Sequence, residues 1–403
     1  MDPPEGIEWL ENSWAVNHPM ICKLKKSFYG WKQVPHLWYK HIDSSLKALG
    51  FTSTNSDSNI NISNTKNIII LLHVDDLLLI SPSLPNLTII KTHLADTHRM
   101  TDLGPVRQFL GIKLSQIIEH SGLQYWTMHQ QWFISTIPSR FGMSACKGIA
   151  TPLDKGKLLS KADQEYKSTL TAQQGYQKLI GSLMYLMMGT RPDHAYTVST
   201  LRKFNCNPTT EHYIAAKRVL RYIQSTAKLQ LTSMLGTESQ LEGFSDSDWA
   251  GDEDDSKSTS GYPFQLSGGT ICLKSRKQSL IALSSTEAQY ISLAETTKEA
   301  TWLRELYQEI CFRQSLNKSS IPSSILIHAD NQAAIQMAKI PRFHERTKHI
   351  SIRYHYVHFA IDNQLITLDY IPTADNPADI LTQALSRDIH DRHISNLGLR
   401  YFT

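Results

Sequence analysis

The 403-residue sequence has little of what marks a secreted, membrane-bound or disulfide-stabilised protein. Its five cysteines are odd in number and widely scattered, and no C-x-x-C pair occurs, which argues against a disulfide framework or a zinc knuckle. The longest apolar run, residues 68–72, is far too short to cross a bilayer, and the first residues lack the basic and apolar stretches of a secretory signal. We therefore expect an intracellular protein, cytoplasmic or nuclear, with no membrane partner.

Strong charge and low complexity are also absent. The formal net charge is only +4, so any contact with nucleic acid must come from local clusters of cations. Hydrophobic residues make up 41% of the chain and charged residues 19%, a balance that excludes a wholly disordered protein. The length predicts two or three domains, each large enough to bury a core.

Secondary-structure patterns divide the chain into regions. Residues 143–237 are helical in pattern and contain no acid cluster, whereas strands and helices alternate from residue 241 onward. In the latter region we expect strands at 241–245, 261–266, 270–273, 324–329 and 365–371, a long helix from about Ser284, and helices after Asp330 and from about Asp375. This order predicts a mixed sheet with helices packed on it, of the α/β or α+β class.

The pair Asp75-Asp76 stands between two apolar segments, residues 68–74 and 77–80, a pattern typical of two strands joined by a two-residue turn. The Ser- and Asn-rich residues 55–67 before it predict a hairpin tip. Turn aspartates often do no more than bond nearby backbone amides. Here the apolar flanks imply burial, and two buried carboxylates repel each other and lose hydration unless a cation lies between them. Oxygen ligands of this kind favour Mg²⁺, so the pair predicts a metal site.

A second set of carboxylates stands at the edges of predicted elements in the C-terminal region. The set comprises Asp246 at a strand end, Glu287 in the first turn of the long helix, Asp330 at the next strand end, and Asp379 near the last helix. A sheet and its helices could bring them to one cleft, where they could hold two Mg²⁺ ions roughly 3.5–4 Å apart for phosphodiester hydrolysis. Each has a structural alternative: a solvated acidic loop for Asp246, a capping box with Ser284 for Glu287, and an N-cap or helix-dipole role for the other two.

Three groups of cations are candidates for contact with a phosphate backbone. They are Lys25, Lys26 and Lys32, which are interleaved with aromatic residues; Lys217, Arg218 and Arg221, on one face of a helix predicted after Pro208; and Arg346, Lys348 and His349. A solvated basic face is the alternative for the first group. The last group belongs to a histidine-rich segment, residues 344–358, without a nearby cysteine. For that segment a basic and aromatic helix touching nucleic acid is favoured over a zinc site.

Motifs along nearly the whole chain, roughly residues 1–390, resemble the C-terminal part of copia-type retrotransposon polyproteins and occur in that family's order. Residues 28–39, FYGWKQVPHLWY, are similar to its L-Y-G-L-K-Q-A-P-R-A-W-Y, and His73-Val-Asp-Asp-Leu-Leu resembles the palm motif Y-V-D-D-[ML]-L of its reverse transcriptase. Further signature segments begin at Asp102, Phe109, Tyr176, Ser245, Ser284, Asp330, Arg346 and Ala378.

The resemblance implies a multidomain protein. The implied regions are a partial reverse-transcriptase palm in residues 1–142, a helical thumb or connection region in 143–237, a ribonuclease-H-like mixed five-stranded sheet with flanking helices in 238–390, and a C-terminal tail in 391–403. The implied partners are an RNA–DNA hybrid or a template-primer, together with further N-terminal polyprotein segments.

The resemblance also implies roles for the candidate residues. Asp75 and Asp76 would be polymerase metal ligands, and Gln33 would line the nucleotide pocket. The ribonuclease H carboxylates would be Asp246, Glu287, Asp330 and Asp379. Each site would use two Mg²⁺ ions, with Mn²⁺ as an alternative metal.

The sequence departs from the family pattern in ways that bear on activity. Family members have a further palm aspartate and the fingers upstream of the segment that residues 1–6 resemble, and this chain starts after them. We therefore expect no independent polymerase activity. Gln289 replaces the second Glu of S-T-E-A-E-Y and Gln383 the Lys of A-D-I-x-T-K, while His73, Trp31 and Thr101 replace Tyr, Leu and Lys.

All four ribonuclease H carboxylates are retained, so the sequence predicts a truncated copia-type protein whose chemically complete activity is hydrolysis of RNA in RNA–DNA hybrids. A catalytically inert nucleic-acid-binding remnant is the alternative, because the palm strand is missing. A strand-transferase is disfavoured, since that class typically ends in a D-D-E triad whereas the order here is Asp-Glu-Asp-Asp.

Overall fold

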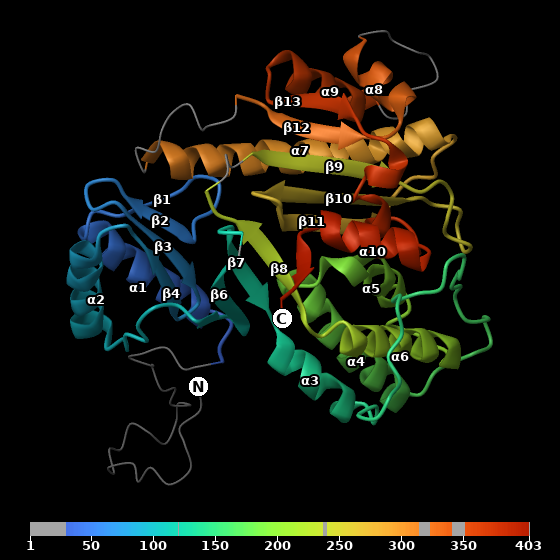
Figure 1. Cartoon of the computed structure of the whole chain (residues 1–403), viewed down its shortest axis with the longest axis horizontal. Helices are drawn as coiled ribbons and strands as arrows, with labels where there is room; N and C mark the ends of the chain where they lie inside the picture. Colours follow the sequence, from blue (N-terminus) through green and yellow to red (C-terminus); the bar gives the residue numbers. More distant parts are fainter. Residues whose placement is uncertain (1–29, 120, 237–239, 314–322, 341–350, 403) are drawn as a thin grey trace, which may run out of the picture. The chain divides into compact units, whose positions relative to one another are not determined.

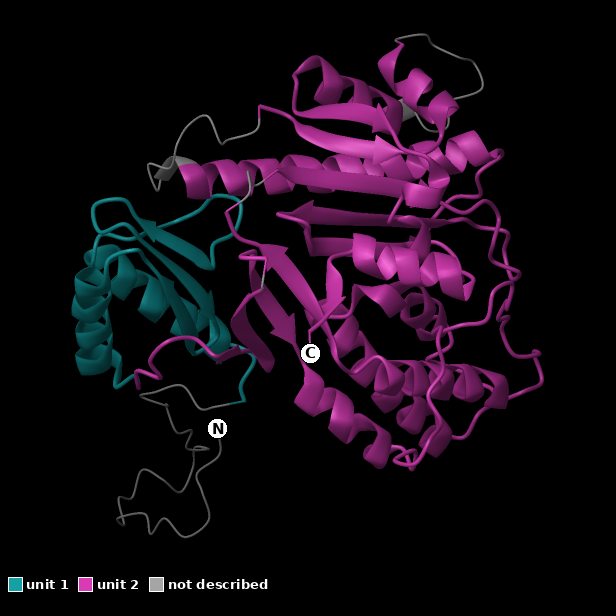
Figure 2. Ribbon diagram, in the orientation of Figure 1, with its two compact units in different colours: residues 1–100 teal, residues 101–403 magenta. Residues whose placement is uncertain are grey.

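The structure is a computed structural model that describes residues 30–402 except 120, 237–239, 314–322 and 341–350. It divides into two compact units, residues 1–100 and residues 101–403, which Figure 2 colours separately. Within the described residues, no helix combines the length and the apolar character that crossing a membrane requires.

The first unit combines an antiparallel sheet with two helices (Figure 1). Its elements are α1 (Val34–Ala48), β1 (Thr52–Ser53), β2 (Ile60–Ser63), β3 (Ile68–His73), β4 (Asp76–Ile80) and α2 (Leu84–His98). The four strands pair in chain order. Alternate residues of β3 point inward, where Ile68 and Ile70 form one core with Ile42 of α1 and Ile90 of α2.

Two expectations for this unit need correction. The turn between β3 and β4 is Val74-Asp75, with Asp76 already paired to His73, because Val74 adopts the left-handed conformation at φ 56°. Strand β2 lies within the segment predicted as a hairpin tip. Its Asn61 is only 2% exposed, so the polar residues of this strand are buried although the segment was predicted to be a hairpin tip.

The second unit contains an antiparallel sheet with the order β14-β8-β7-β6-β5. Its strands are β5 (Gln108–Phe109), β6 (Ile112–Ile118), β7 (Gln124–His129), β8 (Leu229–Met234) and β14 (Leu399–Tyr401). The helices that share a core with this sheet are α3 (Gln131–Arg140), α4 (Leu170–Gly189), α5 (Ala195–Arg202) and α6 (Thr210–Ser225), with the short 3-10 helix η1 (Pro192–His194) between α4 and α5.

Helix α6 has the start and the buried face that the sequence predicts. The Thr209 hydroxyl accepts a hydrogen bond from the His212 backbone N–H, and the His212 ring bonds back to the Thr209 N–H in a capping box. Val219, Leu220 and Ile223 are buried in the core. The spacing of these apolar residues therefore fixes which face of the helix packs.

The same unit contains the mixed five-stranded sheet that the resemblance implied, with the order β11-β10-β9-β12-β13. Its strands are β9 (Leu241–Ser247), β10 (Thr259–Leu266), β11 (Gly269–Lys277), β12 (Ile325–Ala329) and β13 (Ile366–Tyr370), and its helices are α7 (Ser285–Arg313), α8 (Gln332–Lys339) and α9 (Ser351–Asp362). Strands β9 to β11 are antiparallel, whereas β12 runs parallel to both β9 and β13. Helix α7 packs on β9, β10 and β12, which buries the sheet core.

The chain after β13 differs from the predicted continuous helix. It forms two 3-10 turns, η4 (Thr373–Asp375) and η5 (Asp379–Leu381), and helix α10 (Arg387–Asn396) begins well after Asp375. Asn376 is extended, with ψ 106°, because the ring of the following Pro377 disfavours the helical conformation for the residue before it.

Two long-range strand pairings join segments that belong to different predicted regions. Strand β14, within the segment expected to be a tail, pairs with β8 in register Leu399↔Leu231. Strands β5 to β7 belong to the same sheet, so residues 101–142 lie in the second unit. The first compact unit accordingly ends at Met100.

Candidate active site

Three of the four predicted C-terminal carboxylates come together at one end of the mixed sheet. Asp246 is near the end of β9, and Asp330 directly follows β12. Since β9 and β12 are parallel neighbours, paired at Ser245↔Ala329, their carboxyl ends lie at the same edge. The η5 turn packs against β9 and supplies Asp379. Asp246 is 5% exposed and Asp379 is 6% exposed.

Neutral donors from two different elements hold the Asp246 carboxylate. Gln289 of α7 donates an amide hydrogen bond to Asp246 Oδ1 at 2.8 Å and a second one to the Ser247 carbonyl at 2.9 Å. The Thr382 hydroxyl, which follows η5, donates to Asp246 Oδ2. Helix α7 and the η5 segment thus both position this side chain.

The other two aspartates also accept hydrogen bonds from neutral groups. The Gln383 amide donates to Asp379 Oδ1, and the Thr373 hydroxyl donates to Asp330 Oδ2 at 2.8 Å. Asn376, which is completely buried, anchors the loop between them by donating to the Ser245 carbonyl of β9 at 3.1 Å. The loop that supplies Asp379 is therefore tied to the strand that supplies Asp246.

The negative charge of this cluster is not fully compensated by the protein. Burial raises the pKa of Asp379 to about 7, and the charge of Asp246 adds to the shift. Burial also raises the pKa of Asp330, again with a contribution from Asp246. His393 Nε2 lies 3.8 Å from Asp379 Oδ2, but burial lowers the pKa of His393 to about 4, so the neutral ring supplies no compensating charge.

Glu287 has the capping role that was its structural alternative. It lies in the first turn of α7 and is 8% exposed. Its backbone N–H donates to the Ser284 hydroxyl at 3.2 Å, and its carboxylate accepts from the Leu283 N–H at 2.9 Å. Because Gln289, two residues further along the helix, contacts Asp246, the first turns of α7 lie beside the aspartate cluster.

The donor set suits a hard divalent cation, although the side chains do not form a preassembled cage. Across the described ranges, no three His, Cys, Asp or Glu side chains are close enough to hold a metal ion. Both oxygens of Asp246, and one oxygen each of Asp330 and Asp379, instead accept from amide and hydroxyl donors. Carboxylates are the ligands that Mg²⁺ prefers, and a bound cation would offset both the burial and the repulsion from Asp246 that raise the two aspartate pKa values.

The predicted polymerase residues lie in the first unit and are exposed. Asp75 and Asp76 stand at the β3–β4 turn, so the burial inferred from their apolar flanks is wrong. The flanking strands alternate, and only every second residue of β3 is buried. Gln33 and Lys32 are exposed at the start of α1, and Trp38 of that helix donates its indole N–H to the Val74 carbonyl beside Asp75.

The predicted phosphate-binding cations divide into three cases. Arg218 pairs with Asp154 at 2.6 Å and Arg221 donates to the Lys147 carbonyl at 2.7 Å, so both tie α6 to the segment between α3 and α4. Lys217 is exposed on the same helix. Five further candidates lie outside the described residues, namely Lys25, Lys26, Arg346, Lys348 and His349.

Comparisons with known proteins identify the family. The model of the family described as reverse transcriptase (RNA-dependent DNA polymerase) matches residues 3–155. The retrovirus-related Pol polyprotein from transposon TNT 1-94 of Nicotiana tabacum is 37% identical, covering 96% of this chain and 28% of that protein. The transposon Ty5-1 protein of Saccharomyces cerevisiae is 32% identical, covering 70% of this chain and 91% of that protein. The chain belongs to the copia-type retrotransposon Pol family.

The predicted resemblance to copia-type Pol proteins is thus confirmed. The chain spans about a quarter of the length of the Pol polyproteins that it matches. Among solved structures, LC11-RNase H1 in complex with an RNA/DNA hybrid is 14% identical, covering 36% of this chain and 94% of that chain, with a TM-score of 0.26.

Sequence reasoning missed the residues that position the aspartates. Gln289 and Gln383 stand out in the sequence only as departures from the copia-type pattern, yet both donate to candidate carboxylates. Thr382 belongs to the segment that resembles A-D-I-x-T-K, but no role was predicted for it. No role was predicted for Asn376 either. A polar residue directly before a proline in a loop between acidic residues was the available signal for Asn376.

Proposed function

We propose that the C-terminal region of this copia-type protein hydrolyses the RNA strand of RNA–DNA hybrids. Asp246, Asp330 and Asp379, joined by Glu287, would hold two Mg²⁺ ions, for which Mn²⁺ could substitute. The observation that carries the proposal is the convergence of Asp330 and Asp379, distant in sequence, on the buried carboxylate of Asp246, with the pKa of Asp379 raised to about 7. Such uncompensated charge is costly unless a cation neutralises it.

The chain's own residues would orient this centre. When bound, the metal ions would supply an activated water and stabilise the leaving oxygen. Gln289 and Thr382 would keep Asp246 at a fixed position through its two oxygens. Asn376 would hold the η5 loop, and hence Asp379, against β9. Glu287, whose Oε2 accepts from the Leu283 N–H, would contribute a further carboxylate oxygen.

A second candidate function is an inert nucleic-acid-binding remnant. One observation favours it: Gln289 and Gln383, at positions where the copia-type pattern has charged residues, occupy oxygens of Asp246 and Asp379. An amide in this position competes with a cation for the carboxylate. We keep the polymerase roles of Asp75, Asp76 and Gln33, and the region boundaries at 142, 237 and 390, as proposals from the resemblance.

Cleavage of a labelled RNA–DNA hybrid separates the two candidates. We expect the full chain with Mg²⁺ to cut the RNA strand, and Asp330→Asn to reduce the rate by about 100-fold or more. The matched control is Asp163→Asn, which removes an exposed carboxylate and should leave the rate unchanged. Hybrid binding without any cleavage by the wild type, or cleavage that survives Asp330→Asn, would reject the nuclease assignment.

A further inference from the structure

An aromatic pocket with a basic rim lies in the second unit between α3 and α4, two helices marked in Figure 1. This α3–α4 pocket has a volume of about 440 Å³, which is in the range of ligand-binding sites. None of its residues was predicted to be a site residue, and none belongs to the aspartate cluster. Its lining includes three aromatic residues, two cations and a glycine, namely Phe133, Phe141, Tyr185, Arg140, Lys178 and Gly181.

The aromatic walls of the pocket are held in place by the rest of the unit. Phe133 and Phe141 pack against the hydrophobic core that α4, α5 and α6 form. The Tyr185 ring lies edge to face with Phe133, with ring centroids 4.8 Å apart, and its hydroxyl donates to the Leu110 carbonyl at 2.9 Å. A ligand therefore meets preformed walls, which reduces the entropy cost of binding.

Gly181 keeps the pocket open in the middle of α4. A Cβ at this position would meet nothing within 4 Å, although glycine is among the least favourable residues for a helix interior. Gly181, Tyr185 and Met188 follow one another at helical spacing, and the last two are 40% and 69% exposed. The exposed apolar surface therefore continues from the pocket toward the end of α4.

The positive charge at the rim of the pocket is not compensated by a carboxylate. Arg140 places its Cζ 5.6 Å from the centroid of the Phe133 ring, and Lys178 is exposed. Neither cation forms an ion pair with another residue in the part of the chain that the structure describes. The sequences of α3 and α4 contain no acidic residue, and these two cations are their only charged side chains. Two positive charges are thus available for an anionic partner.

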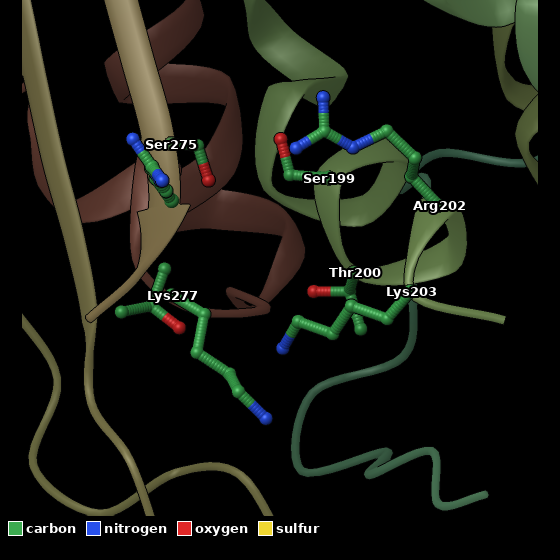
Figure 3. A pocket seen from close by; sticks show the side chains of 8 residues that line it. Ser199, Thr200, Arg202, Lys203, Ser275 and Lys277 are labelled. Atoms are coloured by element: carbon green, nitrogen blue, oxygen red, sulfur yellow. The ribbon is translucent and has the colours of Figure 1, made fainter. Parts of the chain in front are cut away.

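A different pocket in the same unit, between α5 and β11, does not combine these features (Figure 3). It is lined by hydroxyl-bearing and basic residues and has no aromatic ring. Its Lys203 and Lys277 each place Nζ 2.9 Å from Asp252 Oδ2, and Lys277 also lies 2.8 Å from Asp255. The protein itself therefore compensates the charge of these two lysines. Of the two pockets, the α3–α4 pocket is the one with both apolar walls and unpaired cations.

The composition of the α3–α4 surface favours a protein partner over a nucleic acid. Aromatic residues, Met and Arg are enriched at protein–protein interfaces, whereas Asp and Glu are depleted there. Interfaces with nucleic acid are much more positively charged than two cations on two helices. In addition, Arg140 covers a face of the Phe133 ring on which a base would otherwise stack.

We infer that the α3–α4 pocket docks an acidic segment of a partner protein. One large apolar side chain of that segment lies over Gly181, between the aromatic walls, where it is removed from water. Carboxylates on either side of this anchor pair with Arg140 and Lys178, and the fork of the guanidinium matches a carboxylate. The rings supply contact area and the two cations set the orientation. The inference does not rest on the proposed nuclease function.

Fluorescence anisotropy of labelled peptides with the full chain tests this inference. The probe is a short peptide with a central Leu-Phe pair flanked by Asp and Glu residues. One control peptide has Ala-Ala at the centre, and a second has Lys at every acidic position. We expect the probe to bind with a dissociation constant of roughly 10–100 µM at low salt and each control peptide to bind about 10-fold more weakly. Equal binding of the three peptides, or no binding of the probe, would overturn the inference.

A variant that fills the pocket shows whether the probe binds there. Gly181→Leu adds a side chain where there is open space and removes no cation, so it should weaken probe binding about 10-fold or more. Its thermal unfolding midpoint should stay the same or rise, because leucine favours a helix more than glycine does. The matched control is Thr171→Leu, at an exposed position in the first turn of α4, which should change the affinity less than about 2-fold. Unchanged affinity in Gly181→Leu would show that the probe binds elsewhere.

A charge reversal tests the second part of the inference at a position that folding does not depend on. Lys178→Glu is exposed and should weaken the acidic probe and strengthen the Lys-bearing peptide, each by about 5-fold at low salt. The control is Lys228→Glu, an exposed lysine outside the pocket. Equal effects of the two variants would overturn the charge pairing. Binding of a labelled single-stranded DNA that Gly181→Leu abolishes would assign the pocket to nucleic acid and overturn the protein partner.

Discussion

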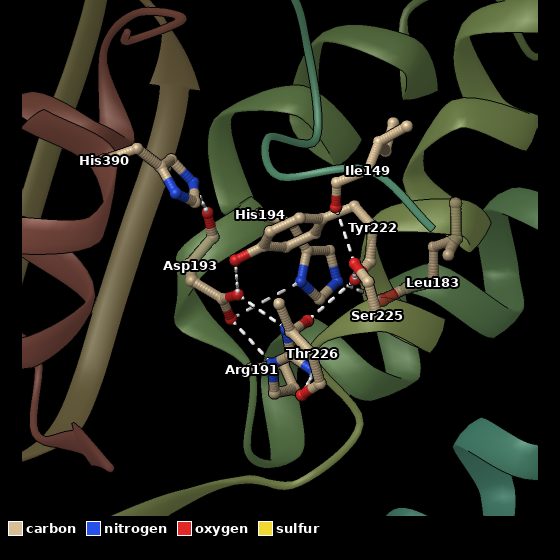
Figure 4. Close-up of polar contacts among 9 residues, drawn as sticks. All are labelled: Ile149, Leu183, Arg191, Asp193, His194, Tyr222, Ser225, Thr226 and His390. Carbon is tan, nitrogen blue, oxygen red and sulfur yellow. Dashed lines mark hydrogen bonds and ion pairs between the residues drawn. The ribbon is translucent and has the colours of Figure 1, made fainter. Parts of the chain in front are cut away.

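Arg191 is a single residue on which we expect the folding stability of the second unit to depend strongly. Its side chain is fully buried and forms two hydrogen bonds to Asp193, from Nε to Oδ1 at 2.9 Å and from Nη2 to Oδ2 at 2.7 Å (Figure 4). The Tyr222 hydroxyl donates to the same carboxylate. His390 of α10 bonds to the Asp193 carbonyl at 3.2 Å. The network therefore connects η1, α6 and the C-terminal helix.

Removal of the Asp193 charge should destabilise the second unit. Asp193→Asn leaves the Arg191 guanidinium buried without a counter-charge, which costs about 3–5 kcal/mol in the free energy of unfolding. Urea titration at pH 7 measures this cost. The exposed Asp163→Asn serves as the control and should change stability by less than about 0.5 kcal/mol. A loss below 1 kcal/mol for Asp193→Asn would show that the pair contributes little.

The Arg191–Asp193 pair also makes the stability loss of Asp193→Asn depend on pH. Burial alone would raise the pKa of Asp193, but the adjacent Arg191 outweighs it and holds the pKa well below its usual value. A group whose folded pKa is depressed stabilises the fold above its unfolded pKa, about 3.9, and loses that contribution as pH falls through the folded value. The difference in unfolding free energy between wild type and Asp193→Asn should therefore be full at pH 6–7 and shrink toward pH 3. A difference that stays constant over this range would contradict the ion-pair account.

Gln289 is a residue at which stability and metal binding oppose each other. Gln289→Glu restores the family pattern but exchanges a donor to Asp246 for a second carboxylate. We expect a loss of about 1–2 kcal/mol without metal, from the lost hydrogen bond and the new repulsion. Mg²⁺ should then raise the Tm of Gln289→Glu more than that of the wild type. Equal Mg²⁺ shifts in the variant, the wild type and the exposed control Gln336→Glu would argue against a cation at this position.

At the scale of elements, local sequence signals determined what could be predicted. Thr209 begins α6 because its hydroxyl caps the helix, and Ser267-Gly268 joins β10 to β11 because both residues adopt positive φ, 52° and 74°. The end of the chain was predicted poorly because Pro377 breaks the helical pattern and the pairing of β14 with β8 spans more than 160 residues. No local pattern encodes such a partner.

Glycine at the junction of two sheets gives a test at this scale. Gly398 has φ 80°, and a Cβ there would meet the Gly268 backbone oxygen at the β10–β11 turn. Gly236 has the same φ of 80° but open space around it. Gly398→Ala should therefore lower the free energy of unfolding by about 1–3 kcal/mol more than Gly236→Ala, because only the former adds a clash to the backbone strain. Equal losses in thermal or urea unfolding would show that the close approach is not required.

At the scale of the whole molecule, the candidate site depends on topology that composition alone does not reveal. The types and order of Asp246, Asp330 and Asp379 could be predicted, because each stands at an element edge and the element order indicates a mixed sheet. Their mutual placement follows from the parallel pairing of β9 with β12 and from the Asn376 anchor. Glu287 could not be placed in advance, because a capping box and a metal ligand share one sequence pattern.

For the polymerase candidates Asp75 and Asp76, the secondary structure was predicted correctly but the exposure to solvent was not. The β3–β4 hairpin was recognised from its apolar strands, but the burial of Asp75 and Asp76 was not a safe inference from those strands. A strand that is apolar on both faces can still end at an exposed turn, since burial is decided by what covers the sheet. In this unit, the described residues leave the turn open to solvent.

The central claim is that buried carboxylates from separate segments form one divalent-cation site. Calorimetric titration of the full chain with Mg²⁺ tests it most directly, using Asp246→Asn to remove the carboxylate that influences both other aspartates and Asp163→Asn as the control. We predict that the wild type and Asp163→Asn bind Mg²⁺ alike and that Asp246→Asn loses this binding. Binding of Mg²⁺ to Asp246→Asn with unchanged affinity and stoichiometry would contradict the account.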